Sequence, residues 1–340
     1  AVGLVDVGTL GKIDIQGPDA LEFIQRIYCN NFANLAVGKL RYGLMLREDG
    51  HVLDDGTTAC LADNHYVMTT TTAAAGLVMR HLEYVLQVVR PDLDAKVISV
   101  TEQWAQFGVA GPKSRDVING IIDAPIDDAS FPYMGCGGIT IDGIAARLFR
   151  ISFSGEQAYE IAVPARYGAS LYKQLVDHVA KLDGGAYGME ALNVLRIEKG
   201  FITHAEIHGR VTAFDIGMDR MVSRKKDCIG QTMAAREGLM DENRAQLVGL
   251  KPVGAVQQMV AGAHLFDAGA DAVRVNDQGY VTSVGFSPTL GHNIALGFLD
   301  RGRARHGEVI RMVDHLREID ATLEVCDPVF FDPTGGRLRG

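Results

Sequence analysis

The sequence predicts an α+β fold that ends in a small all-β domain, and three observations carry this prediction. Strand-like and helix-like segments alternate in the first two thirds of the chain without a regular β-α-β rhythm, which argues against a doubly wound parallel sheet. From about Met240 onward, short strands follow one another and helical periodicity nearly disappears, as is typical of a small barrel or sandwich. The length of 340 residues corresponds to about two domains. We therefore expect two α+β lobes within residues 1–238 and a β-barrel domain over residues 239–340.

The α+β region is expected to begin with a strand and turn over Val5–Ile15. The tripeptide Gly17-Pro18-Asp19 then breaks the chain and caps a helix, and the turn Glu48-Asp49-Gly50 joins two strands into a hairpin. Apolar residues at periods of two and of about 3.6 predict the remaining elements. Strands are expected at Tyr42–Leu46, Val52–Cys60, Tyr66–Thr72, Trp104–Val109, Tyr159–Val163 and, as a pair, within Ile139–Ser154. Helices are expected at Leu77–Val89, Ser114–Ile122, Tyr167–Lys181 and Met189–Glu198.

The C-terminal domain is expected to start after the run that ends at Gly238. Its apolar segments are short and are separated by glycine, by Asp-Gln-Gly and by Ser-Pro, all of which favour turns. Strands are expected at Leu247–Leu250, Ala272–Val275, Tyr280–Phe286, Ile294–Phe298 and Val309–Val313.

Composition and charge exclude several classes of protein. Hydrophobic residues make up 47% and charged residues 22% of the chain, as in ordinary globular proteins. No apolar run approaches the roughly 18 residues that a membrane helix needs, so no membrane partner is expected. The net charge of −9 gives no global attraction to nucleic acid.

Cysteine usage and the start of the chain suggest where the protein works. The five cysteines are odd in number and none forms a C-x-x-C pair, which argues against a disulfide framework and favours the reducing cytoplasm. The chain lacks an initiator Met and a signal peptide and opens directly on a strand. We therefore expect a segment of a longer protein.

Motifs for the common cofactors are absent from the sequence. No G-x-G-x-x-G follows a strand and no phosphate-binding loop is present, so flavin and nicotinamide are not expected to bind. His204 and His208 lie four residues apart and would share a metal only on a helix. Glycines bracket them and no third ligand is near, so we interpret them as loop or strand histidines and expect no metal site.

Five runs of residues, read in order, resemble those of one family. They are Gly3–Val7 with Ile15–Ala20, Tyr42 with Glu48–Gly56, Ser152–Glu156 with Tyr159–Ile161, Leu195–Gly200, and Tyr280–Ser283 with Ser287–Gly291 and Asn293–Ala295. Together they are similar to the aminomethyltransferase superfamily, whose type member is the T-protein of glycine cleavage. The similarity is greatest to the folate-binding C-terminal half of the α subunit of heterotetrameric sarcosine oxidases. It covers nearly the whole chain and implies three lobes around a central channel that holds tetrahydrofolate.

The resemblance implies a catalytic role for Asp55. Aligning Leu53-Asp54-Asp55 with the family places the second aspartate against the pterin–imidazolidine region of the folate, with Asp54 beside it in the binding site. A fixed negative charge there would stabilise the cationic transition state that forms when a folate nitrogen attacks an iminium or formaldehyde carbon. The alternative interpretation of an Asp-Asp-Gly sequence is a solvated strand end.

Four further residues are implied in folate binding by the same resemblance. Glu160 corresponds to the glutamate that accepts hydrogen bonds from the aminopterin edge. Tyr42 and Thr70 match family positions near the folate, although packing within the sheet is an equal alternative for both. Phe153 stands where T-proteins carry a tyrosine, and it offers a ring for stacking without the hydroxyl.

The sequence also departs from the T-protein pattern. Leu192 replaces an arginine expected near the glutamate tail of the folate, and the loop Phe201–Glu206 replaces a Tyr-Gly-x-Asp loop. The first change puts glycine cleavage in doubt and fits the sarcosine oxidase branch, and the second implies a different amine substrate. The basic run Arg220–Lys226 is interpreted as either a site for a polyglutamate tail or a solvated turn. Cys228 is interpreted as a small buried residue rather than a reactive thiol.

These implications lead to one main functional hypothesis and two alternatives. The main hypothesis is an enzyme domain that takes the one-carbon unit of oxidised sarcosine, or of a similar N-methyl amine, and forms 5,10-methylenetetrahydrofolate. Flavin-bearing subunits or segments of an oxidase complex would be its partners. The alternatives are a folate-binding scaffold without catalysis and a free-standing, tetrahydrofolate-dependent demethylase.

Overall fold

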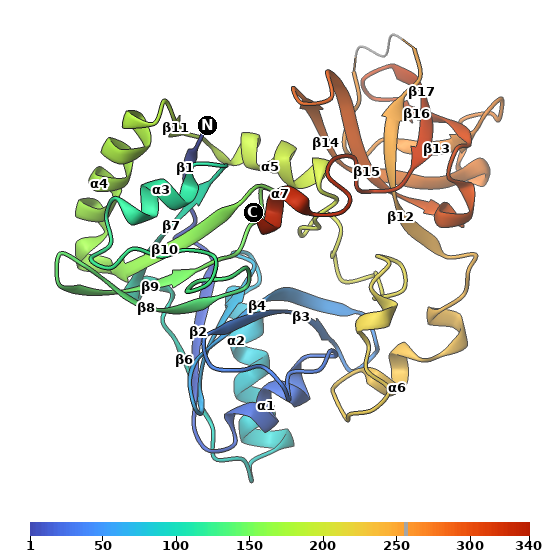
Figure 1. Cartoon of the computed structure of the whole chain (residues 1–340). Helices are drawn as coiled ribbons and strands as arrows, with labels where there is room; N and C mark the ends of the chain where they lie inside the picture. The colour runs from blue at the N-terminus through green and yellow to red at the C-terminus, as the bar shows by residue number, and fades with distance from the viewer. Residues whose placement is uncertain (255–257) are drawn as a thin grey trace.

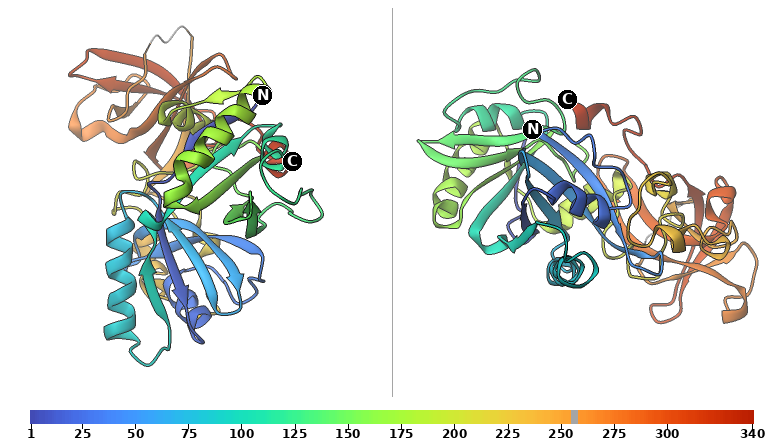
Figure 2. Two further views of the ribbon diagram at one scale, coloured as in Figure 1. Left: turned by 90° about the vertical axis from the view of Figure 1, so that its left-hand side faces the viewer. Right: turned by 90° about the horizontal axis from the view of Figure 1, so that it is seen from below.

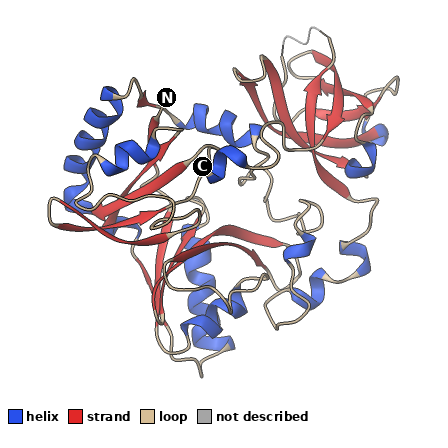
Figure 3. Ribbon diagram, viewed as in Figure 1, coloured by secondary structure: helices blue, strands red, loops and turns tan. Residues whose placement is uncertain are grey.

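The computed structural model, which describes residues 1–254 and 258–340, consists of an antiparallel sheet, a mixed sheet and a barrel (Figure 1). One sheet has five strands, the other has six, and the C-terminal strands close into a barrel. Figure 3 shows that helices cover the two sheets, whereas the barrel is built almost entirely of strands. The predicted α+β class with a C-terminal β-barrel is therefore confirmed.

The first lobe is the five-stranded sheet with the order β3-β4-β5-β2-β6. Its strands are β2 (Gly11–Gln16), β3 (Lys39–Leu46), β4 (Val52–Ala62), β5 (His65–Thr70) and β6 (Lys96–Ser99), and its helices are α1 (Ala20–Ile27) and α2 (Ala75–Tyr84), the latter extended by a π-helical turn at Val85–Val89. Figure 2 shows α2 lying along the outer face of the sheet. Ile13, Phe23 and Met68 belong to the core between this face and the helices.

The hairpin predicted around Gly50 joins β3 to β4. Gly50 has a φ of 86°, and a Cβ there would lie 2.5 Å from the backbone nitrogen of Ala234. Both the turn and the close approach of a later segment therefore require glycine at this position.

The second lobe is the six-stranded sheet with the order β11-β1-β7-β10-β9-β8. Its strands are β1 (Gly3–Asp6), β7 (Trp104–Ala110), β8 (Cys136–Ile141), β9 (Ile144–Phe149), β10 (Ala158–Pro164) and β11 (Gly185–Ala186), and its helices are α3 (Ser114–Asn119), α4 (Gly168–Lys181) and α5 (Met189–Glu198). The first two strands of the chain belong to different sheets, since β1 pairs with β7 and β2 pairs with β5. The turn between them therefore crosses from one lobe to the other.

The barrel has the strand order β12-β15-β14-β13-β16-β17. Its strands are β12 (Ala245–Pro252), β13 (His264–Asp267), β14 (Asp277–Ser287), β15 (His292–Asp300), β16 (Val309–Asp314) and β17 (Ile319–Cys326). The strand predicted at Ala272–Val275 is wrong, because these residues form a bend and the start of a 3₁₀ turn at Arg274–Asn276. β13 and β17 were not predicted. Apolar and polar residues alternate along β17 (IDATLEVC), which is a strand signal that the prediction overlooked.

An irregular segment from residue 200 to 244 connects α5 to the barrel. It holds only short helical turns, among them α6 (Gln231–Ala234). It returns to the first lobe, where Val52 N donates to the Val211 carbonyl at 2.9 Å. The domain boundary predicted at residue 238 falls within this segment and stays a prediction.

The C-terminal tail returns to the second lobe. α7 (Gly336–Arg339) lies against it, and Arg150 Nη2 donates to the Arg339 carbonyl at 2.7 Å. Across residues 1–254 and 258–340, every helix is too short or too polar to span a membrane.

Candidate functional site

The two faces of the first sheet separate the two predicted aspartates. Successive residues of a strand point to opposite faces, so Asp54 shares the helix-covered face with Met45, its register partner on β3. Asp54 has no exposed surface. Its carboxylate accepts hydrogen bonds from Thr71 Oγ1 at 2.8 Å and from Thr71 N at 3.2 Å.

Asp55 occupies the opposite face of the sheet, together with Tyr42. The Tyr42 hydroxyl donates to Asp55 Oδ2 at 2.8 Å. The sulfur of Met218, from the irregular segment, lies 3.8 Å from the same hydroxyl. The structure therefore places Asp55 and Tyr42 together on a face that the 200–244 segment approaches.

The electrostatic environment keeps the two aspartates only partly ionised near neutral pH. Burial raises the pKa of Asp55 to about 7, and the charge of Asp54 adds to this effect, whereas Tyr42 and His204 oppose it. Burial likewise raises the pKa of Asp54 to about 6, against the hydrogen bonds from Thr71. Carboxyl groups perturbed in this way are typical of functional sites.

Glu160 lies on β10 in the second lobe, beside two residues that the sequence did not single out. Gln106 on β7 donates its side-chain amide to the Glu160 carboxylate. Lys12 on β2 contributes a positive charge. Burial raises the pKa of Glu160 to about 7, while Gln106 and Lys12 counteract the rise.

The charge of Lys12 acts on Glu160 because the chain crosses between the lobes at this point. Its ammonium is buried and donates to the carbonyls of Gly8 at 2.8 Å and Leu10 at 2.9 Å, both in the crossing turn. Lys12 belongs to the first sheet, whereas Glu160 belongs to the second. The sequence signal was a lysine within the otherwise apolar start of a strand.

Polar residues occupy the face of the first sheet that carries Asp55. Thr57 follows Asp55 by two residues and so shares its face, and its hydroxyl lies 2.9 Å from that of Thr69. Thr69 is the register partner of Lys12, whose charge acts on Glu160. Asp55 and Lys12 therefore belong to one polar face of the sheet.

The structure places Thr70 away from this path. It follows Thr69 on β5 and therefore points to the helix-covered face, where it is 2% exposed and donates to the Thr71 carbonyl at 3.0 Å. The predicted contact of Thr70 with folate stays a prediction, and its neighbour Thr69 lies on the face that carries Asp55. Period-two alternation from Asp55 could have found this difference.

Phe153 lies in the loop between β9 and β10 and pairs with the 201–206 loop. It is 38% exposed, and its ring stacks on Phe201 with a centroid distance of 5.9 Å. The side chain offers an open ring face. No contact within the described part of the chain joins it to Asp55 or Glu160.

A buried ion pair fixes the 201–206 loop. Arg196 on α5 lies 3.0 Å from Glu206, and both side chains are almost fully buried. Glu206 also accepts hydrogen bonds from the hydroxyls of Thr282 and Ser283 on β14, each at 2.6 Å. The pair thus joins the second lobe, the loop and the barrel.

The basic run around Arg224 is only partly a solvated turn. Arg224 and Lys225 are exposed. Lys226 instead donates to the carbonyl of Tyr28 and to those of Gln25 and Asn30, at the C-terminal end of α1. Cys228 is buried with 5% exposure, and burial raises the pKa of its thiol.

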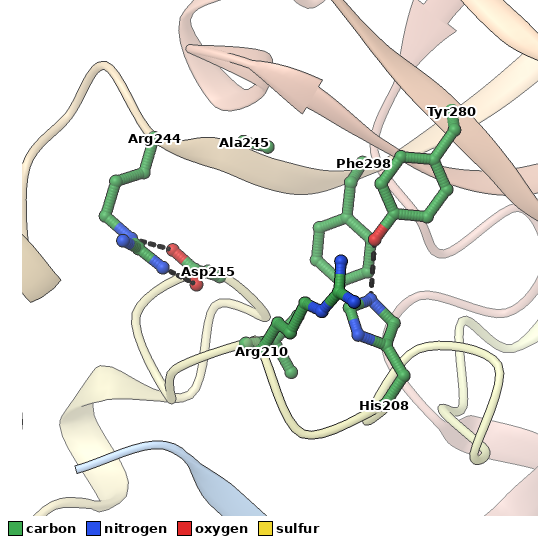
Figure 4. Close-up of a pocket in the computed structure, with 8 residues that line it drawn as sticks. His208, Arg210, Asp215, Arg244, Ala245, Tyr280 and Phe298 are labelled. Atoms are coloured by element: carbon green, nitrogen blue, oxygen red, sulfur yellow. Dashed lines mark hydrogen bonds and ion pairs between the residues drawn. The ribbon is translucent and has the colours of Figure 1, made fainter. Parts of the chain in front are cut away.

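A separate cavity of about 360 Å³ lies between the irregular segment and the barrel (Figure 4). His208 contacts Tyr280 by a hydrogen bond, and Arg244 forms a two-pronged ion pair with Asp215 at 2.7 and 2.8 Å. None of the residues predicted for folate lines this cavity. Within residues 1–254 and 258–340, the metal-binding residue types form no group of three that could hold an ion.

Comparisons with known proteins agree with this architecture. The family model of the GCVT N-terminal domain matches residues 1–226, and that of the glycine cleavage T-protein C-terminal barrel domain matches residues 246–332. The crystal structure of the glycine cleavage system aminomethyltransferase T from Bartonella henselae superposes with a TM-score of 0.83 at 24% identity, covering 97% of this chain and 86% of that one.

Two groups of relatives match over most of the chain. The sarcosine oxidase subunit alpha of Rhizobium meliloti (strain 1021) is 50% identical over 99% of the chain, and that of Corynebacterium sp. (strain P-1) is 41% identical over all of it. The chain spans only 34% and 36% of these relatives. The aminomethyltransferase of Streptomyces coelicolor is 29% identical over 90% of the chain and 80% of its own length. The predicted family is therefore confirmed, and the chain belongs to the aminomethyltransferase family of glycine-cleavage T-proteins.

Proposed function

We propose that the chain is a tetrahydrofolate-binding domain that accepts a one-carbon unit from an oxidised N-methyl amine, such as sarcosine. The observation that carries the proposal is a pair of enclosed carboxylates: Asp55 on the polar face of the first sheet, and Glu160, on which the charge of Lys12 from the same face acts. Each is held by neutral hydrogen-bond donors, so each keeps capacity to accept bonds from a ligand. Tetrahydrofolate fits this arrangement, because its aminopterin edge presents donors and its reacting nitrogens pass through a cationic state.

Glu160 would bind the aminopterin edge. A carboxylate accepts two parallel N–H bonds from such a ring, and charge-assisted bonds of this kind are short and strong. Gln106 holds one carboxylate oxygen, and the nearby Lys12 favours the ionised form. The two neighbours thus orient Glu160 and favour its charged form against the effect of burial.

Asp55 would act at the reacting end of the folate. Bound tetrahydrofolate supplies two nitrogen nucleophiles that take the carbon of an N-methylene iminium, and the two protons that leave these nitrogens end on the departing amine. The Asp55 carboxylate places a fixed negative charge beside the cationic carbon. Tyr42 orients that carboxylate, because its hydroxyl occupies one oxygen and leaves the other free.

The sequence identities favour the sarcosine oxidase branch for the donor of the carbon. The named sarcosine oxidase subunits are 41–50% identical to the chain, against 29% for the aminomethyltransferase of Streptomyces coelicolor. We infer that flavin-bearing segments or subunits oxidise the amine and pass on the product. The five free cysteines support a cytoplasmic location.

A binding and a transfer assay together test the proposal. Titration with folinate in a calorimeter is expected to show one site per chain. Formaldehyde and tetrahydrofolate are then expected to react faster with the protein than without it. Absence of folinate binding would refute the proposal, and binding without acceleration would support the scaffold alternative.

A further inference from the structure

A hydrogen-bonded chain leads from the exposed ring of His204 to the buried carboxylate of Asp54. Thr71 Oγ1 lies 2.8 Å from Asp54 Oδ1 and 2.9 Å from His204 Nε2. His204 is exposed, whereas Asp54 has no exposed surface. The three residues come from β4, from the end of β5 and from the 201–206 loop. The Arg196–Glu206 ion pair fixes this loop.

The hydroxyl of Thr71 can satisfy this geometry in two ways, because it carries one proton and can also accept. When Asp54 is ionised, Thr71 donates to it and accepts from His204 Nε2–H. When Asp54 is protonated, its own O–H donates to Thr71, and Thr71 donates to the bare Nε2. Asp54 Oδ1, Thr71 Oγ1 and His204 Nε2 therefore keep their hydrogen bonds in both arrangements.

A proton passes from His204 through Thr71 to Asp54 when the arrangement with ionised Asp54 becomes the one with protonated Asp54. The proton on Nε2 of a charged His204 ring moves to the Thr71 oxygen, while the Thr71 proton moves to the Asp54 oxygen. Imidazolium and carboxylate become imidazole and carboxylic acid, and no other bond changes. The exposed Nδ1 of His204 keeps its proton and remains in exchange with water.

The proton content of Asp54 determines the charge state of Asp55. The two carboxyl groups are adjacent on β4, and the negative charge of Asp54 opposes ionisation of Asp55. When Asp54 takes up a proton, this repulsion disappears and Asp55 ionises more readily.

The other titratable groups around the two aspartates are tyrosines. Tyr42 on β3 contacts Asp55, and Tyr28 lies near both carboxyl groups from the end of α1. Burial raises the pKa of both tyrosines above 10, so both remain neutral near pH 7. His204 is therefore the group through which solvent protons reach this side of the site.

We propose that His204 and Thr71 form a proton wire between solvent and Asp54, and that the charge which this wire sets on Asp54 modulates the ionisation of Asp55. Both are positioning residues, because they act through Asp54 and Asp55. The part of this inference that concerns one-carbon transfer rests on the proposed function, whereas the wire itself does not.

The wire is tested first without folate. In the protein labelled with ¹⁵N-histidine, the neutral His204 ring is expected to carry its proton on Nε2 above pH 7, where Asp54 is ionised. Asp54→Asn removes the nearby negative charge, and Thr71→Val removes the hydroxyl between the two groups, so both are expected to weaken the preference for the Nε2 proton. A tautomer unchanged in both variants would overturn the wire.

The pH profile of one-carbon transfer tests the effect on Asp55. His204→Gln keeps an N–H donor but removes the influence of His204 that lowers the pKa of Asp55, so the acid limb is expected to move to higher pH. Thr71→Val removes the hydroxyl that donates to the Asp54 carboxylate, so the pKa of Asp54 is expected to rise. A more protonated Asp54 repels Asp55 less, and the acid limb is therefore expected to move to lower pH. A merely structural role would lower the plateau without moving the limb, and that result would overturn the proposal.

His208→Gln is the matched control. His208 is an exposed histidine in the same segment, but it bonds to Tyr280 in the separate cavity, so its loss is expected to leave the limb in place. The two failures are distinguishable. Absence of transfer in the wild type with intact His204–Asp54 coupling refutes the proposed function alone, whereas transfer without coupling refutes the wire alone.

Discussion

Replacing Asp55 by asparagine removes one negative charge from the polar face and keeps the shape of the side chain. The amide oxygen can still accept from the Tyr42 hydroxyl, which lies 2.8 Å from Asp55 Oδ2. Tyr42 therefore keeps its partner, and the sheet around it is expected to stay intact. The substitution tests the charge of Asp55 rather than its packing.

The size of the effect follows from the proposed role. Loss of one preorganised electrostatic group in an enclosed site typically lowers the rate by about 100- to 1,000-fold. Folinate is a stable ligand that lacks the cationic reacting carbon, so its affinity is expected to change by less than about threefold. A selective loss of rate marks an interaction made in the transition state.

The pH dependence provides a second, independent readout. Burial and the charge of Asp54 raise the pKa of Asp55 to about 7. The ionised fraction, and with it the transfer rate of the wild type, should rise roughly tenfold between pH 6 and pH 8. Asp55→Asn should show no such rise. An equally steep rise in the variant, or a loss of rate below tenfold, would refute the catalytic assignment of Asp55.

Three further predictions concern binding and stability. Glu160→Gln should raise the dissociation constant of folinate about 10- to 150-fold, since a charge-assisted contact contributes about 1.5–3 kcal/mol. Calorimetry measures this, and normal folinate binding by the variant would contradict the assignment of Glu160. Asp55→Asn should stabilise the fold by about 1–3 kcal/mol at pH 8 but not at pH 4, because burial raises the pKa of the Asp55 carboxyl to about 7. Such a carboxyl destabilises the folded protein increasingly as the pH rises from its unfolded pKa to its folded pKa. Thermal unfolding at both pH values measures this, and a variant less stable than the wild type at pH 8 would contradict it. Arg196→Met should destabilise the protein by about 3–5 kcal/mol, because it leaves Glu206 charged and buried. Arg196→Met combined with Glu206→Leu should destabilise it less. Urea unfolding of both variants tests this, because a simple loss of packing would make the double variant the less stable of the two.

Local patterns were sufficient to predict most of the elements but not their assembly. The hairpin at Gly50 and the helix Met189–Glu198 appear where the sequence places them, because turn chemistry and helical periodicity act over a few residues. β17 was missed although its apolar residues alternate with polar ones, which is itself a strand signal. The strand predicted at Ala272–Val275 is a bend whose apolar residues lie at the surface, with Val275 86% exposed.

The site residues show the same division. Asp55 and Glu160 were named from aligned motifs, and the structure places both in enclosed, polar surroundings. The contact of His204 with Thr71 joins positions 133 residues apart, so no local pattern contains it. Alternation along β5 does contain the distinction between Thr69 and Thr70, and it indicates Thr69 for the polar face.

The crossing of the chain between β1 and β2 explains why the site lies between the lobes. A buried carboxylate such as Glu160 is costly unless a positive charge or hydrogen-bond donors face it. The second sheet supplies the donor, Gln106, from the neighbouring strand β7. The cation comes from the first sheet, because the turn after β1 carries the chain across and fixes the Lys12 ammonium on its own carbonyls. Charge at Glu160 therefore depends on the two lobes being docked, and a ligand that needs this charge also favours the docked arrangement.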